Sequence, residues 1–141
     1  MSSSGYGDLF RDAYSLLHGG RADEIEGAAA RRAGEPVEEY LARTRSEALG
    51  GMRKRLLAED PPPALAGAHR LLLELLTSAA AADEALTEQV SAYRCGQFHE
   101  SVAHSDRLHQ LVIDSQRMDR ELIAALRDLP AETVATLGIE L

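Results

Sequence analysis

The sequence predicts an all-α protein, an antiparallel helical bundle of three to four main helices with a short N-terminal helical arm. Two observations predict this class. The five prolines are confined to positions 36, 61–63 and 130, so the segments between them lack the residue that most strongly breaks helices. Within those segments apolar residues recur at steps of three and four, which is the spacing of one helix face.

The N-terminal part is expected to begin with a disordered stretch, because residues 1–7 are rich in serine and glycine. A short helical arm follows over residues 8–18, with most of its apolar residues on one side and two glycines as a C-terminal cap. Residues 21–33 are rich in good helix formers and are predicted to form another helix, which ends at Gly34. Residues 8–141 together are expected to form a single helical domain.

The first long helix is predicted over residues 36–58. Pro36 suits its first turn, glutamates follow near its positive end, and the basic residues 53–55 lie near its negative end. The helix dipole explains this basic cluster better than an anion-binding site does. Gly50 and Gly51 should each cost about 1 kcal/mol relative to alanine. Either a neighbour approaches closely there or the helix bends.

Two further long helices are predicted over residues 63–94 and 98–129. Gly96 separates them, and because glycine readily adopts the left-handed conformation that caps a helix, the chain should reverse there. The alternative is one continuous helix of about 100 Å, which would need an oligomer to bury its apolar face. Pro130 ends the last long helix, and a short terminal helix is expected after it.

The last long helix carries the most regular apolar pattern of the chain. Its residues recur at alternating steps of four and three, a heptad pattern that packs against a partner helix. Leu111, Met118 and Leu122 occupy the regular part of this seam, and they form either the interface of a homodimer or the core of a monomer. The seam consists of His104, Leu108, Leu111, Ser115, Met118, Leu122, Ala125 and Leu129.

Composition excludes several classes of function. The net charge of −8 argues against nucleic-acid binding, which needs a basic surface. Cys95 is the only cysteine, so no intrachain disulfide is possible and a reducing cytoplasm is expected. The start lacks the pattern of a signal peptide, and no apolar stretch is long enough to span a membrane. Lys54 is the only lysine among 15 basic residues, a bias typical of a GC-rich bacterial genome.

A metal site is the first chemical possibility, with His104, Glu100 and His109 as its candidate ligands. Glu100 lies one helical turn before His104, and His109 follows Asp106 by three residues, so each pair could share a helix face. However, histidines five residues apart differ in direction by about 140 degrees on a helix. The sequence also lacks the Glu-x-x-His pairs of di-iron bundles. We therefore expect no native metal and no cofactor.

Two other polar features are candidates for chemistry. His69 lies on the apolar stripe of its helix, and we expect a histidine at the edge of the core rather than a ligand. Cys95 and His99 have the i, i+4 spacing of a thiol paired with imidazole, but only if the helix continues through Gly96. An idle thiol is the simpler interpretation.

The sequence contains no phosphate-binding loop, no dinucleotide fingerprint, no zinc-protease motif and no nucleophile elbow. It carries no motif that is specific to a known family. The pattern favours a non-catalytic, cytoplasmic helical-bundle protein that acts in protein–protein interaction or homo-oligomerisation. The alternatives are a bundle that binds a small apolar ligand, with or without a regulatory role, and a metal-binding bundle.

Overall fold

The computed structural model of the chain describes residues 3–19 and 30–141. These residues form five α-helices and a short 3-10 turn, and they contain no strand, which confirms the predicted all-α class. The helices are α1 (Ser3–Leu17), α2 (Val37–Leu57), α3 (Ala66–Arg94), α4 (Phe98–Arg127) and α5 (Ala131–Ala135), and the 3-10 turn is Pro63–Leu65.

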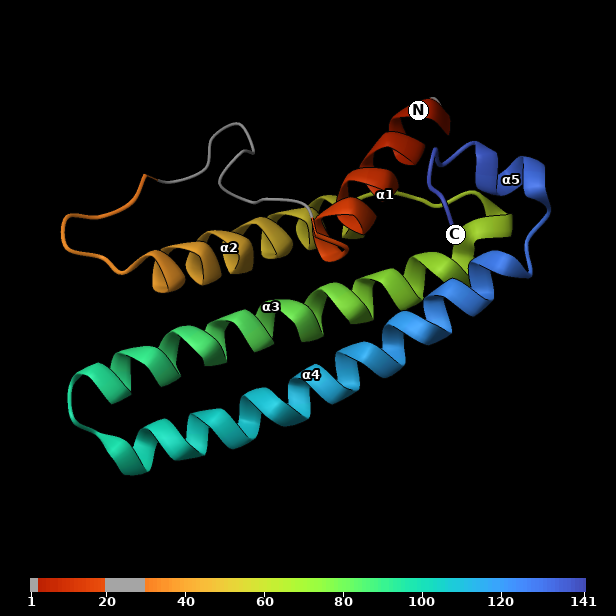
Figure 1. The fold of residues 1–141 in the computed structure, drawn as a ribbon. Coiled ribbons are helices and arrows are strands. Elements are labelled where there is room, and N and C mark those ends of the chain that lie inside the picture. Colours follow the sequence, from red (N-terminus) through yellow and green to blue (C-terminus); the bar gives the residue numbers. More distant parts are fainter. Residues whose placement is uncertain (1–2, 20–29) are drawn as a thin grey trace.

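Helix α3 lies between α2 and α4 and runs antiparallel to both of them (Figure 1). The chain reverses at Gly96, whose φ is 77°, and the continuous-helix alternative is therefore wrong. The amide of Gln97 donates to the carbonyl of Ala92 at 2.8 Å, and the amide of Gly96 donates to that of Tyr93 at 3.1 Å. This pair of hydrogen bonds is the Schellman motif, which satisfies the last carbonyls of α3.

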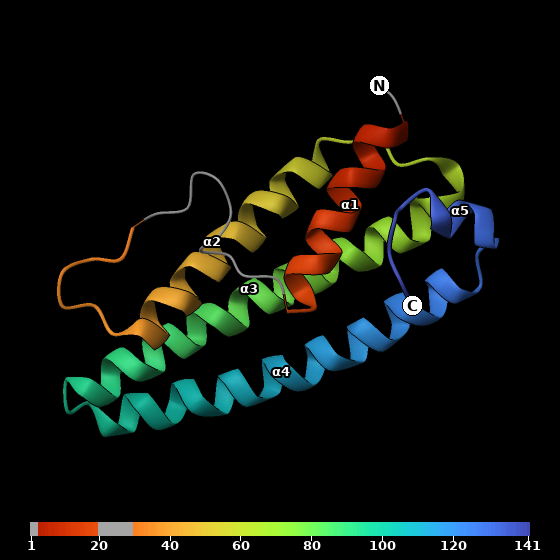
Figure 2. The same ribbon diagram turned by 45° about the horizontal axis from the view of Figure 1, so that its top comes forward.

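The arm α1 lies across α2 and α3 at one end of the bundle, beside α5 and the C-terminus (Figure 2). It begins at Ser3 rather than residue 8, so the disordered start expected for residues 1–7 is wrong for residues 3–7. Tertiary packing overrides the composition here, because Tyr6 and Gly7 are buried. A Cβ atom on Gly7 would lie 2.6 Å from the carbonyl oxygen of Thr136, so only glycine allows this approach.

The helix predicted over residues 21–33 is wrong for its described part. Residues 30–33 are not helical, and residues 21–29 lie outside the described part of the chain. Glu35 holds the segment before α2 in a different conformation. Its carboxylate accepts hydrogen bonds from the backbone amide of Arg32 at 3.0 Å and from two nitrogens of Arg43 at 2.8 and 3.0 Å.

The two glycines inside α2 have no close neighbour. An added Cβ on Gly50 or Gly51 would meet no atom within 4 Å. The interpretation that a neighbouring segment approaches them closely is therefore wrong. Helix α2 continues through both residues to Leu57.

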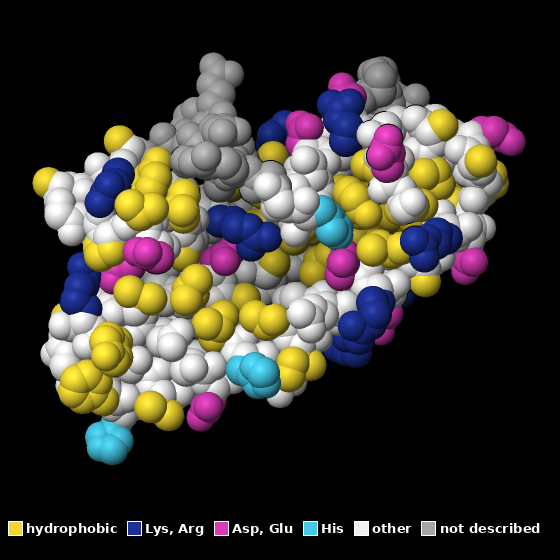
Figure 3. All heavy atoms as spheres, viewed as in Figure 1, with side chains coloured by type: hydrophobic (Ala, Val, Ile, Leu, Met, Phe, Trp, Pro, Cys, Tyr) yellow, Lys and Arg dark blue, Asp and Glu magenta, His cyan; other side chains and the backbone are white. Residues whose placement is uncertain are grey.

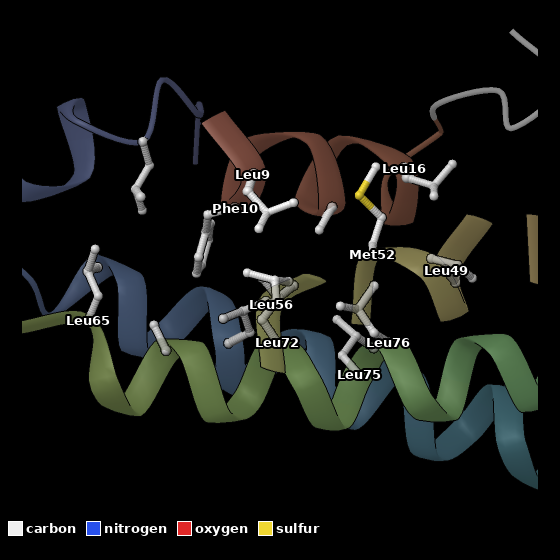
Figure 4. Packing of buried hydrophobic residues seen from close by; sticks show 14 of the residues in the cluster. Leu9, Phe10, Leu16, Leu49, Met52, Leu56, Leu65, Leu72, Leu75 and Leu76 are labelled. Atoms are coloured by element: carbon white, nitrogen blue, oxygen red, sulfur yellow. The ribbon is translucent and has the colours of Figure 1, made fainter. Parts of the chain in front are cut away.

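The hydrophobic core is built where α1 covers the long helices. Figure 4 shows Leu9, Phe10 and Leu16 of α1 above Leu72, Leu75 and Leu76 of α3, with side chains of α2 between them. The opposite end, where α2 begins and α3 turns into α4, lies beyond the reach of α1 (Figure 1). The largest fully buried side chains are Phe10, Leu49, Leu56, Leu72, Leu76, Leu122, Leu126 and Leu137.

The heptad seam of α4 faces the rest of its own chain. Leu122 is 0% exposed and belongs to the core, Met118 packs against that core, and Leu111 is half-buried. Of the two alternatives for Leu122, monomer core or dimer interface, the structure has the monomer core. Helix α3 is the partner helix of the seam. Within residues 3–19 and 30–141, no helix is both long and apolar enough to cross a membrane.

Candidate functional site

His69 is a buried histidine with one hydrogen-bond partner, in line with its expected place at the edge of the core. It is 9% exposed, and its Nδ1 lies 2.7 Å from the hydroxyl oxygen of Tyr6. Burial lowers the pKa of His69, and burial together with the charge of Glu59 raises the pKa of Tyr6. The phenol therefore stays protonated and donates to a neutral imidazole. This contact joins α1 to α3.

The burial of His69 predicts a pH dependence of stability. Its pKa is lower in the folded protein than the usual value of 6.5, so the unfolded chain takes up a proton first as the pH falls. The contribution of His69 to stability should be complete above pH 6.5 and should decrease below it, until the pH falls under the folded-state pKa. We expect this decrease in urea denaturation of the wild type and a flatter profile in His69→Gln. The same dependence of the unfolding free energy on pH in the wild type and in His69→Gln would contradict this prediction. The control is His109→Gln, which replaces an exposed histidine.

The three candidate metal ligands are not brought together. His104 Nδ1 lies 3.2 Å from a carboxylate oxygen of Glu88 on α3, and Arg107 approaches the same oxygen at 3.6 Å. Glu100 and His109 are exposed on α4. Among the described residues, no group of three or more His, Cys, Asp or Glu side chains is arranged to hold a metal ion.

Cys95 and His99 do not share a helix. Helix α3 ends at Arg94 and α4 begins at Phe98, so the i, i+4 geometry that would pair the thiol with the imidazole is absent. Cys95 is exposed at the turn. The structure gives no support to a cysteine nucleophile here.

An interrupted row of exposed apolar side chains runs along α4, with the polar residues Asp106 and His109 between Val102 and Ile113. It starts at the α3–α4 turn, where Phe98 packs edge-to-face on Tyr93 with 5.5 Å between the ring centroids. Phe98 is 60% exposed, Tyr93 67% and Val102 61%. This exposure is notable for Phe98 and Tyr93 because aromatic side chains are usually buried in the core. Ile113 continues the stripe along α4. We call Phe98, Val102 and Ile113 the α4 stripe.

A pocket opens on another face of the bundle, next to the C-terminal end of α1. Its volume is about 410 Å³. Figure 3 views the molecule from the same side as Figure 1 and shows hydrophobic side chains interspersed with charged ones between the long helices. We call this space the α1 pocket, and it is lined by Leu17, His18, Arg45, Leu75, Ala79, Ala82, Asp83, Leu86, Leu108, Val112, Ser115, Gln116 and Asp119.

Arg45 is the first of two basic side chains that line this pocket. Its guanidinium lies 2.6 Å from a carboxylate oxygen of Asp83 and 3.5 Å from the last carbonyls of α1, those of Leu16 and Leu17. Arg45 thus joins α2 to α3 and places positive charge at the negative end of α1. Burial raises the pKa of Asp83, and the nearby Arg45 opposes this shift.

His18 is the second. Its Nδ1 lies 2.7 Å from the carbonyl oxygen of Tyr14, and its Nε2 lies 2.7 Å from a carboxylate oxygen of Asp119. Both ring nitrogens thus lie within hydrogen-bond distance of an oxygen atom. The contact ties the end of α1 to α4 across 101 residues of sequence.

Sequence reasoning did not find the α1 pocket. Its charged pairs join residues 38 and 101 positions apart, which no local spacing reveals. The one signal was the run of small residues at Ala79 and Ala82 within the apolar face of α3, because small side chains leave space between helices. The sequence pattern did not indicate the α4 stripe either, because the heptad seam marks the opposite side of that helix.

Comparisons with known proteins give no relative: no protein-family model matches the chain, and neither a curated protein nor a solved structure is significantly similar to it.

Proposed function

We propose that the protein is a non-catalytic helical bundle that acts by self-association, with the α4 stripe as its interface. The observation that carries the proposal is the exposed aromatic pair Tyr93 and Phe98. The chain has only six aromatic residues, and two of them lie mostly in solvent at one turn. Aromatic side chains are enriched at protein interfaces and supply much of their binding energy.

The order of residues along the stripe favours a second copy of the chain as the partner. If two α4 helices pair antiparallel about a twofold axis between residues 107 and 108, Val102 of one copy lies opposite Ile113 of the other. The same axis sets Asp106 opposite His109, so an acidic group meets a group that can carry positive charge. It also sets Phe98 opposite Arg117, a pairing that allows a cation–π contact. The surface is therefore self-complementary, as a twofold interface requires.

The size of this surface is compatible with a modest dimer interface. From Phe98 to Arg117 the helix extends over about 30 Å, at 1.5 Å per residue. Each aromatic ring that becomes fully buried contributes about 150–250 Å². Because Phe98 is 60% and Tyr93 67% exposed in the monomer, only that part of each ring can be newly buried, and most of the roughly 800 Å² per partner of a standard interface has to come from the rest of α4.

Light scattering of the purified protein tests the proposal. At about 100 µM the wild type should have twice the mass of the 15.3 kDa chain. Val102→Glu should reduce this to the mass of one chain without loss of helical content, because the interface would bury an unpaired carboxylate. The matched control is Ala103→Glu, the same charge on the next residue, which is exposed but lies off the stripe.

Two results would contradict the proposal. One is a wild type that has the mass of a single chain at 100 µM. The other is a dimer that persists unchanged in Val102→Glu, which would place the interface elsewhere on the molecule.

A further inference from the structure

We infer that the α1 pocket binds a small, uncharged and largely apolar molecule that carries a hydrogen-bonding group. The inference is independent of self-association, since most of the pocket lies between α1, α3 and the side of α4 that faces them. It rests on the shape of the pocket, on its charges and on one pair of serines.

The pocket lies over α3, next to the C-terminal end of α1. Helix α1 ends at Leu17, and α3 continues beyond it with an apolar stripe over which no helix of residues 3–19 and 30–141 lies. Two members of that stripe, Ala79 and Ala82, are small, so a hollow remains between longer apolar side chains. Its volume of about 410 Å³ lies within the range of about 300–1,000 Å³ usual for small-molecule sites. The stripe consists of Leu75, Ala79, Ala82 and Leu86.

The charges of the pocket favour an uncharged occupant. Arg45 is paired with Asp83, and His18 with Asp119, each over 2.6–2.7 Å. A charged ligand would have to break one of these contacts and leave Arg45, Asp83 or Asp119 without its partner in a partly buried place. An apolar molecule leaves both pairs intact and covers the aliphatic floor.

Ser115 provides a polar contact for the ligand. Its hydroxyl lies 2.7 Å from that of Ser78, which in turn lies 3.5 Å from the carbonyl oxygen of Leu111. Because Ser78 donates its one proton to the Leu111 carbonyl, Ser115 donates to Ser78 and keeps an oxygen lone pair that can accept a hydrogen bond in the pocket. An amine or amide N–H or an alcohol O–H of the ligand would donate to this oxygen, while the rest of the molecule contacts leucine and alanine side chains.

The same contacts argue against a partner helix as the occupant. The contact from His18 to Asp119 joins the end of α1 to α4 at the lining of the pocket, and Arg45 joins α2 to α3 there. A helix about 10 Å in diameter needs a groove open at both ends. A compact small molecule does not.

The test uses a neutral fluorescent probe, N-phenyl-1-naphthylamine, and the full chain. The wild type should bind it saturably with one site per chain, and binding should raise the melting temperature. Ala82→Leu should weaken binding at least tenfold, because the added side chain fills the hollow. The matched control Ala103→Leu adds the same atoms at an exposed position of α4 and should leave binding unchanged.

A second variant keeps the test decisive if Ala82→Leu does not fold. Val112→Trp fills the same space from a lining residue that is already 39% exposed, so it is expected to fold and to lose probe binding. The anionic analogue, 8-anilino-1-naphthalenesulfonate, should bind more weakly than the neutral probe. The inference is overturned if the wild type shows no saturable binding, if a folded pocket-filling variant binds as tightly as the wild type, or if the anionic analogue binds more tightly.

Discussion

Leu122→Glu is expected to abolish folding. Leu122 is 0% exposed and lies among the leucines on which α1, α3 and α4 converge. Placing a carboxylate there removes an apolar side chain worth about 1.5–3 kcal/mol and adds the larger cost of a buried charge without a partner. Because a domain of this size is stable by only about 5–15 kcal/mol, most of the folded population should be lost. Circular dichroism would show the loss of helical signal.

The matched control for this variant is Ile113→Glu, the same charge on the exposed side of the same helix. It should keep the helical signal of the wild type and, under the proposed function, lose the dimer. If instead Leu122→Glu gave a folded monomer, Leu122 would lie in an interface between chains and the packing of α4 described above would be wrong.

Phe10→Ala is expected to cost about 3–5 kcal/mol of unfolding free energy. Phe10 is fully buried and carries α1 into the core, where it lies above the leucines of α3 (Figure 4). Its removal leaves a cavity at the place where the arm is held. Urea denaturation at constant pH measures the loss.

The other phenylalanine of the chain is the natural control. Phe98 is 60% exposed at the α3–α4 turn, so Phe98→Ala should change the stability of the monomer by no more than about 0.5 kcal/mol. The comparison is made below 1 µM protein, where association does not add to stability. Similar losses for the two variants would mean that α1 is not anchored by Phe10.

The architecture was predictable because it depends on local signals. Gly96 marked the reversal, since the turn needs a positive φ, and the prolines marked the ends of α2 and α4. The heptad seam identified which side of α4 packs against another helix. These features follow from spacing and backbone conformation along a few residues.

The candidate sites were not predictable, because they depend on contacts between distant segments. The composition of residues 1–7 indicated disorder, yet Tyr6 is held by His69, 63 residues away. Nothing near His18 in the sequence points to Asp119. The α1 pocket exists because one helix is shorter than its neighbours, and its position is defined only once the helices are docked.

The length of α1 limits how much of the long helices it covers. With 15 residues it extends about 22 Å, whereas α4, with 30 residues, extends about 45 Å. Gly19, at a φ of 101°, follows the end of the short helix. Because α1 lies across α2 and α3, it covers only part of the length of these helices (Figure 2).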